Sequence, residues 1–241
     1  MLIHKHPIGT VAYLGGVPAI LERFSWSFLQ MVLYSQEYLC DSTQYLHVDR
    51  SKVSYHAKAR NELCQAMLGD WIFMTDGDHD LPPDILARLL QLLYKYGVEV
   101  ISGTYHVKIP PHPPLIYAKH SDESLREKGY ELVACVDNPG ELVKIDAVGA
   151  GCLLIRRRLL HKLITELREQ PFAIIPPLSE DLSFCRRLEK LNVPLYWAPN
   201  IISPHLDVMR VVPDEEELRK LASEARETEG LLKGELPQMQ K

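Results

Sequence analysis

The sequence predicts an α/β fold in which helices flank a mostly parallel central sheet. One observation is composition: 241 residues with 46% hydrophobic and 24% charged residues are typical of a soluble globular protein with a substantial core. A second is the run Trp71–Met74, which is short, continuously apolar and typical of a strand buried on both faces. The third is the segment 85–96, where apolar residues recur at helical spacing directly after that strand.

Charge and cysteine content restrict the class of protein. A net charge of -5 supplies no broad attraction for nucleic acid. The five cysteines are odd in number and widely spaced, which indicates neither a disulfide framework nor a zinc site and is typical of a reducing cytoplasm. Polar residues interrupt the apolar residues of segment 1–9, and no later run is long enough to span a membrane, so we expect no signal peptide and a cytoplasmic location.

The segment 69–97 joins the predicted strand to the predicted helix through an acidic loop, residues 76–80. Pro82 and Pro83 predict the helix start, and Gly97 stands where a C′ glycine belongs. The loop carries three carboxylates within five residues, which repel one another unless a cation or ordered donors hold them. A solvated acidic turn is one interpretation. Because ligands bind at the carboxyl ends of strands in open α/β sheets, a site for a hard divalent metal is favoured.

The chain before this segment has the pattern of two strand and helix pairs. Residues 8–13 predict a first strand, and an apolar face beginning near Pro18 predicts a helix. Residues 45–48 predict a second strand, and 56–70 a helix with Arg60 and Asn61 near its start. On its own, such an Arg-Asn pair is typical of a solvated helix face.

After the helix, residues 98–102 predict another strand, and the proline-rich stretch 109–117 predicts an ordered loop. Lys108 is a candidate for contact with a diphosphate, or an exposed lysine without a partner. Residues 121–129 are polar and predict an excursion from the core. Alternating residues at 130–136 and 141–148, separated by turn residues, predict a hairpin.

The last part of the chain adds two glycines, a helix start and a late histidine. Gly149 and Gly151 precede a buried strand and a helix within 148–163. Segment 179–192 predicts a helix with Ser179 as N-cap and acidic residues in its first turn, which the helix dipole alone favours. A strand over 194–198 leads towards His205, and 214–232 predicts a charged amphipathic helix for packing, a lid or partner contact.

A strand, an Asp-x-Asp, a Pro-Pro-Asp and a leucine-rich helix together resemble the GT-A glycosyltransferases, especially their family 2-like group. The resemblance implies that Asp76, Gly77 and Asp78 hold a metal and the diphosphate of a sugar nucleotide. It assigns Asp78 to direct metal ligation and Asp76 to the ribose or to the metal through water. A histidine at the place of His205 completes the ligands in many such enzymes, and imidazole shifts the preference from Mg²⁺ towards Mn²⁺.

The resemblance extends from about Ile8 to His205 and implies further roles. Arg60 would hold the nucleotide and the acidic loop, since a guanidinium binds carboxylate or phosphate in bidentate fashion. Asp181 would be the catalytic base, while Glu180 caps its helix or holds the acceptor. Other candidates for donor binding are Gly9, Thr10, Tyr13, Asn61, Lys108, Gly149 and Gly151. Gly9 and its neighbours could equally serve only to turn the chain.

These features favour a metal-dependent glycosyltransferase that transfers a sugar from a UDP- or GDP-sugar to an unknown acceptor hydroxyl, with inversion. The acceptor could be a saccharide, a small molecule, a protein or a modified nucleic acid. We expect one domain over 1–241, with a nucleotide-sugar half (1–104), an acceptor half (105–207) and a helical extension (208–241). A nucleotidyltransferase is the alternative enzyme, although the start of the chain lacks its glycine-rich, basic phosphate loop. A silent module that binds sugar or nucleic acid is the alternative outside catalysis.

Overall fold

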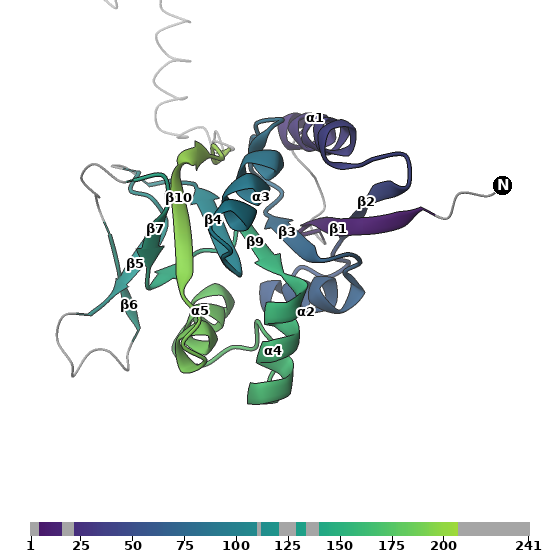
Figure 1. Cartoon of the computed structure of the whole chain (residues 1–241). Helices are drawn as coiled ribbons and strands as arrows, with labels where there is room; N and C mark the ends of the chain where they lie inside the picture. The colour runs from purple at the N-terminus through teal and green to yellow at the C-terminus, as the bar shows by residue number, and fades with distance from the viewer. Residues whose placement is uncertain (1–4, 16–21, 110–111, 121–128, 134–139, 207–241) are drawn as a thin grey trace, which may run out of the picture. The chain divides into compact units, whose positions relative to one another are not determined.

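A seven-stranded sheet forms the centre of the computed structural model, which describes residues 5–15, 22–109, 112–120, 129–133 and 140–206 (Figure 1). The strand order is β2-β1-β3-β9-β4-β10-β7. The strands of this sheet are β1 (His6–Tyr13), β2 (Gln44–Arg50), β3 (Trp71–Thr75), β4 (Val100–Thr104), β7 (Val143–Ile145), β9 (Cys152–Arg156) and β10 (Leu195–Ile202). The helices are α1 (Glu22–Leu39), α2 (His56–Ala66), α3 (Ile85–Lys95), α4 (Arg157–Leu167) and α5 (Glu180–Lys190).

The prediction of a mostly parallel α/β sheet is confirmed. β1 pairs in parallel with β2 and β3, and β4 pairs in parallel with β10. Only β7 and β9 run antiparallel to their neighbours. The parallel strands therefore end at one edge of the sheet, where ligands of open α/β proteins bind.

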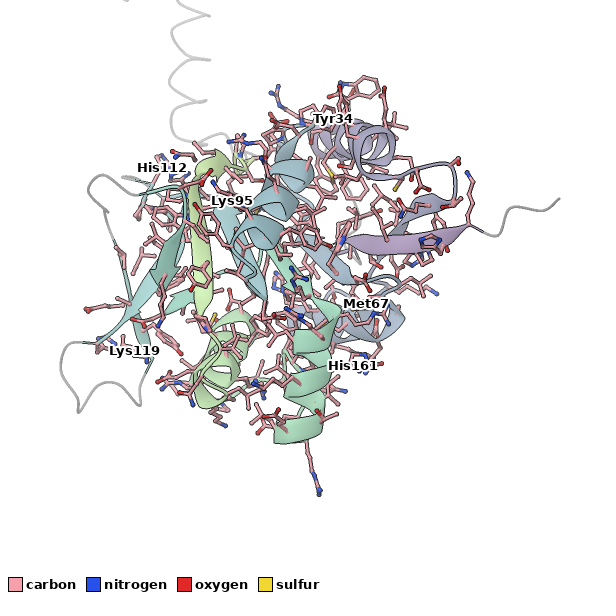
Figure 2. The ribbon with its side chains drawn as sticks, viewed as in Figure 1. Tyr34, Met67, Lys95, His112, Lys119 and His161 are labelled. Carbon is pink, nitrogen blue, oxygen red and sulfur yellow. The ribbon has the colours of Figure 1, made fainter. Side chains whose placement is uncertain are left out.

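Helices cover both faces of the sheet (Figure 1). Helices α1 and α3 pack on one face through residues such as Phe24, Met31 and Leu89. Helices α2, α4 and α5 pack on the other, through residues such as Leu63 and Phe184. Figure 2 shows side chains filling the space between the helices and the sheet. Burial on both sides explains why residues 71–74 of β3 form a continuous apolar run.

Strand β9 is inserted between β3 and β4 and runs against both. Its first residue, Cys152, lies opposite Thr75, the last residue of β3. The glycines that precede β9 therefore arrive at the carboxyl end of β3, beside the acidic loop. An antiparallel insertion thus places residues 149–151 next to residue 76.

Strand β10 carries the late histidine to the same edge. It runs parallel to β4, and its last residue, Ile202, lies opposite Thr104. The predicted strand over 194–198 lies inside β10, which continues through Pro199 with an irregular register. The Ser203 amide then donates to the Thr104 carbonyl at 2.8 Å, so His205 follows directly at the sheet edge.

The hairpin predicted between 130–136 and 141–148 is wrong for the residues that the structure describes. Residues of the first stretch form β6 (Tyr130–Leu132), which pairs with β5 (Ile116–Lys119). The second stretch divides into β7, which joins β10, and β8 (Ala147–Val148), which pairs with the other side of β5. Alternation of apolar and polar residues predicts strands but not which strands pair. The middle strand, β5, begins at the end of the proline-rich stretch, which was predicted to be a loop.

Some predictions fall outside the described residues. These are the helix start at Pro18, most of the excursion 121–129, most of the turn at 137–140 and the helix at 214–232. The division at 104/105 stays a prediction, and the extension 208–241 lies outside the described part. Within the described part, no helix combines the length and apolarity that crossing a bilayer requires.

Candidate active site

Asp78 lies at the centre of a cluster of charged side chains at the carboxyl edge of the sheet. Lys108 Nζ is 2.6 Å and His205 Nε2 is 3.3 Å from Asp78 Oδ2. Burial acts to raise the pKa of the Asp78 carboxyl, but hydrogen bonds from His205 and Lys108 outweigh it and hold that pKa well below its usual range. Asp78 is therefore a carboxylate at any physiological pH. Lys108, one-third exposed, has a charged partner, so its interpretation as a lysine without a partner is wrong.

His205 reaches Asp78 with its ring orientation set by the backbone. Its Nδ1 lies 2.9 Å from the His106 carbonyl oxygen, which can only accept, so Nδ1 carries a proton. Nε2 is then the atom that faces Asp78. Burial lowers the pKa of His205, but its bonds to Asp78 and His106 outweigh that effect and raise it. Metal-binding histidines typically donate the N–H of their other ring nitrogen to such a group, as Nδ1 of His205 does to the His106 carbonyl.

His79 is a functional candidate that the sequence analysis did not select. Its side chain is fully buried, and Nδ1 lies 2.7 Å from Ser203 Oγ. Nε2 has no hydrogen-bond partner among the described residues. Burial lowers the pKa of His79 to about 4, so the imidazole is neutral at physiological pH. Its position between two carboxylates in the acidic loop was a signal available from the sequence alone.

The residues of the cluster fit a divalent cation. Asp78, His79 and His205 each offer a ligand atom, and these atoms all lie within 4.8 Å of one another. One carboxylate and two imidazoles form a donor set that suits transition ions. The Lys108 ammonium provides positive charge on the same carboxylate.

Arg60 joins the acidic loop to the start of α5. Its guanidinium donates to Asp76 Oδ1 at 2.9 Å, to Glu180 Oε1 at 3.4 Å and to the Ala150 carbonyl at 3.0 Å. The residue is only 2% exposed. Burial acts to lower the pKa of Arg60, but Asp76 and Glu180 outweigh it and raise that pKa, so the charge persists. Bonding to three acceptors in different directions requires a planar guanidinium with several N–H groups.

Asn61 lies beside Arg60 in α2 but serves a different contact. Its Oδ1 accepts a hydrogen bond of 2.9 Å from the Phe172 amide, and the side chain is buried. This hydrogen bond therefore joins α2 to the segment that follows α4. We do not retain it as a donor-binding residue.

Gly149 and Gly151 let the chain approach a buried tyrosine and the acidic loop. A Cβ on Gly149 would lie 2.0 Å from Tyr105 Oη, and one on Gly151 would lie 2.8 Å from His79 Nε2 and 3.0 Å from Asp76 Oδ2. Tyr105 Oη also accepts a 3.0 Å hydrogen bond from the Gly151 amide. Tyr105 directly follows β4, which was the only signal in the sequence for its presence here.

The two acidic residues at the start of α5 have different surroundings. Glu180 lies against Arg60. Asp181 accepts from Ser179 Oγ and from the Leu182 amide through Oδ1, while its Oδ2 lies 3.5 Å from where a Gly149 Cβ would stand. Ser179 occupies the N-cap position as predicted, although its hydroxyl bonds to Asp181. Asp181 Oδ2 is thus directed towards the glycine loop.

The three candidates in β1 separate into two groups. Gly9 packs under the Trp71 ring, which a Cβ would meet at 2.2 Å. Thr10 is fully buried and exchanges 2.8 Å hydrogen bonds with the Leu68 backbone. Tyr13 is the last residue of the strand, and its ring packs edge-to-face against Phe24 and Phe28 of α1. Of the three, only Tyr13 stays a candidate for donor binding.

Comparison with protein-family models decides the family. The model described as glycosyl transferase family 2 matches residues 34–164, more than half of the chain. The chain belongs to this family. It is therefore a glycosyltransferase, and the GT-A fold expected from the acidic loop is confirmed. A search of curated protein sequences finds no significant match.

A search of solved structures finds proteins that resemble this chain at low sequence identity. GalNAc-T7, in a crystal structure with UDP, GalNAc and Mn²⁺, superposes with a TM-score of 0.60 at 13% identity. The alignment covers 83% of this chain but only 43% of that protein. A197 from STIV gives a TM-score of 0.49 at 14% identity, covering 83% of this chain and 86% of that one.

Proposed function

We propose that this family 2 glycosyltransferase is metal-dependent and transfers a sugar from a UDP- or GDP-sugar to an acceptor hydroxyl with inversion. One observation carries the proposal: Asp78 and His205, distant in sequence, meet at 3.3 Å beside the carboxyl end of β3. Mn²⁺ and Mg²⁺ are both ions for such a site. The imidazole favours Mn²⁺, the ion named with UDP in the GalNAc-T7 structure.

On the donor side, Asp78 and His205 would hold the ion. A bound divalent ion supplies Lewis-acid stabilisation of the negative charge that develops on a leaving nucleoside diphosphate. Arg60 holds Asp76 through Oδ1 and leaves Oδ2 available for a ribose hydroxyl or an ordered water. Lys108, bonded to Asp78, lies where its ammonium could bind a diphosphate oxygen.

On the acceptor side, we assign the general base to Asp181. An acceptor hydroxyl must lose its proton as it attacks the anomeric carbon, and a carboxylate with an available oxygen can take it. Asp181 Oδ2 faces the glycine loop, whereas Glu180 is engaged by Arg60. This difference supports Asp181 as base and Glu180 as a residue that orients Arg60.

The proposed halves of the chain both contribute to this site. Asp76 and Asp78 come from the nucleotide-sugar half, 1–104, while Lys108, Asp181 and His205 come from 105–207. Gly151 keeps the space beside Asp76 and His79 open, and Gly149 keeps the space beside Tyr105 and Asp181 open, which suits close approach of a donor sugar.

The test is release of nucleoside diphosphate from UDP- and GDP-sugars with Mn²⁺ or Mg²⁺. UDP-GalNAc is the first donor to try, since UDP and GalNAc are named with GalNAc-T7. Removing the metal with a chelator, or the ligand with Asp78→Ala, should lower the rate by roughly a hundredfold or more. Asp80→Ala is the matched control, because that loop carboxylate pairs with exposed Arg23 at 2.6 Å. Full activity in excess chelator would reject metal dependence, and release of sugar 1-phosphate in place of the nucleoside diphosphate would indicate nucleotidyl transfer.

A further inference from the structure

The Nε2 nitrogen of His79 is buried at the site, and the proposed function assigns no role to it. His79 Nε2 is shielded from solvent and has no partner among the described residues, although Nδ1 of the same ring lies 2.7 Å from Ser203 Oγ. Leaving a buried polar atom unpaired is unfavourable, because the atom loses its hydrogen bonds to water without a replacement. Such an atom calls for an explanation, and a bound ion is one of the standard ones.

The backbone directs His79 and His205 towards each other. The two residues form an antiparallel bridge, flanked by hydrogen bonds from the Asp80 amide to Pro204 at 2.8 Å and from the Leu206 amide to Asp78 at 2.6 Å. Their ring centroids lie 4.9 Å apart. A short two-stranded pairing therefore holds both imidazoles on the same face of the pairing, close to each other.

Both rings are anchored through the same atom. Nδ1 of His205 is held by the His106 carbonyl, and Nδ1 of His79 is held by the Ser203 hydroxyl, which the Ser203 amide fixes to β4 through Thr104. Nε2 of His205 faces Asp78, and Nε2 of His79 has no partner among the described residues. Partners of this kind on the far nitrogen orient the histidine ligands of metals.

The space around His79 Nε2 is kept open by a glycine. A Cβ on Gly151 would come within 2.8 Å of Nε2 and 3.0 Å of Asp76 Oδ2. Any side chain there would cover the nitrogen. One ligand atom from each of Asp78, His79 and His205 lies within 4.8 Å of the other two, so the three side chains are grouped closely enough to share an ion.

We propose that His79 Nε2 is a third protein ligand of the metal, which adds a second imidazole to the pair Asp78 and His205. This inference rests on the proposed metal dependence and deepens it, because two nitrogen ligands favour Mn²⁺ and later transition ions over Mg²⁺. His79 therefore sets which metal the enzyme selects.

The first experiment counts the imidazoles on the metal without any substitution. The full chain is loaded with Co²⁺ in the presence of UDP, and the proton NMR spectrum is searched for hyperfine-shifted signals that disappear in D₂O. Each ligating ring contributes its Nδ1–H, so two such signals are expected, one from His79 and one from His205. A single signal would overturn the proposal while leaving a metal site in place.

The second experiment measures Mn²⁺ and Mg²⁺ affinity by calorimetry, with UDP present. His79→Asn keeps an amide near the position of Nδ1 for Ser203 and deletes Nε2. Its Mn²⁺ affinity should fall by about a hundredfold or more, and its Mg²⁺ affinity by less, since Mg²⁺ prefers oxygen ligands. Ser203→Ala, which keeps Nε2, should lose only about tenfold. Unchanged Mn²⁺ affinity in a folded His79→Asn protein would reject the ligand role.

The two proposals fail in different ways. If the native chain with UDP binds neither Mn²⁺ nor Co²⁺, the proposed metal dependence fails, and this inference fails with it. If the native chain binds Mn²⁺ but shows one exchangeable imidazole signal, only the role of His79 fails. Circular dichroism in excess chelator establishes that each variant is folded, and the Co²⁺ spectrum of the native chain decides the question if His79→Asn does not fold.

Discussion

Arg60 shows how a single side chain connects the two sides of the site. Its guanidinium contacts Asp76 from the acidic loop, Glu180 from α5 and the backbone carbonyl of Ala150. Two carboxylates compensate a charge that is almost completely removed from water. Breaking a buried pair of this kind on one side leaves an uncompensated charge and costs about 3–5 kcal/mol.

We expect Arg60→Lys to weaken donor binding while the fold survives. Lysine keeps the charge but cannot bond to three partners in different directions, so Asp76 loses its fixed position. The KM for the nucleotide sugar should rise about tenfold or more, as for loss of one charge-assisted hydrogen bond. Arg23→Lys is the control, since Arg23 is exposed and pairs only with Asp80 among the described residues. An unchanged KM would show that Arg60 does not position the donor site.

Asp181→Asn should separate donor binding from transfer. The amide preserves shape but cannot take the acceptor proton, so turnover should fall by about a hundredfold or more while metal-dependent binding of UDP persists. Glu180→Gln, which alters the partner of Arg60, should affect turnover less. The measurement is transfer rate together with calorimetric UDP affinity. Near-normal transfer by Asp181→Asn would remove this residue from the mechanism and would favour retention of configuration.

At the scale of elements, the insertion of β9 between β3 and β4 builds the site. Because β9 runs against its neighbours, its beginning lies where their ends lie. Residues 149–151 thus reach Tyr105, Asp76 and His79 at once. This closeness leaves no room for side chains at the two glycines.

We expect Gly149→Ala to lower both stability and activity, because its methyl group would collide with Tyr105 Oη at 2.0 Å. Overpacking of this kind costs about 1–3 kcal/mol. Adding Tyr105→Phe removes the colliding oxygen, so the double variant should be more stable than the sum of the single effects predicts. Urea unfolding of the four proteins measures this coupling.

Gly140→Ala is the control for that cycle, since a Cβ there meets no atom of the described residues within 4 Å. It should unfold like the native chain. Additive effects of Gly149→Ala and Tyr105→Phe would mean that the loop moves away from Tyr105, and the close approach would then not be needed for the site.

At the scale of the whole molecule, the hydrophobic core on the two faces of the sheet buries several ionisable side chains away from water. Burial raises the pKa of the Cys152 and Cys185 thiols to about 12, and burial also raises the pKa of Tyr105 far above its usual range. Each of these groups is neutral in the folded chain. In the unfolded chain a thiol loses its proton near pH 8.5.

The fold should therefore lose stability in alkaline solution. A group whose folded pKa is raised contributes stability that is complete below the unfolded pKa, near 8.5, and is lost as the pH rises towards 12. Each buried thiol should contribute a fall of up to about 1.4 kcal/mol per pH unit in the free energy of unfolding. Urea unfolding at pH 7.5, 9 and 10 tests this. Cys185→Ala should reduce the slope, and a slope equal to that of the native chain would contradict the assignment.

The sequence by itself determined the class of fold and much of the donor side. Local periodicity sufficed for β3 and α3, because a strand buried on both faces and a one-sided helix each leave a direct pattern. Gly97 has the positive φ of 63° expected after a helix, and the Val98 amide donates to Leu93 as in a Schellman end. The acidic loop was visible because its carboxylates are adjacent in the chain.

Only the tertiary structure decided which distant residues meet. The partners of 130–132 and 143–148 depend on β5, an element that the proline-rich pattern concealed. His79 and Tyr105 gain their roles from the pairing of 78–80 with 204–206 and from the insertion of β9, neither of which leaves a mark in local periodicity. Burial and hydrogen bonding of a polar atom are properties of its three-dimensional surroundings, and they are what distinguish a ligand from a solvated side chain of the same type.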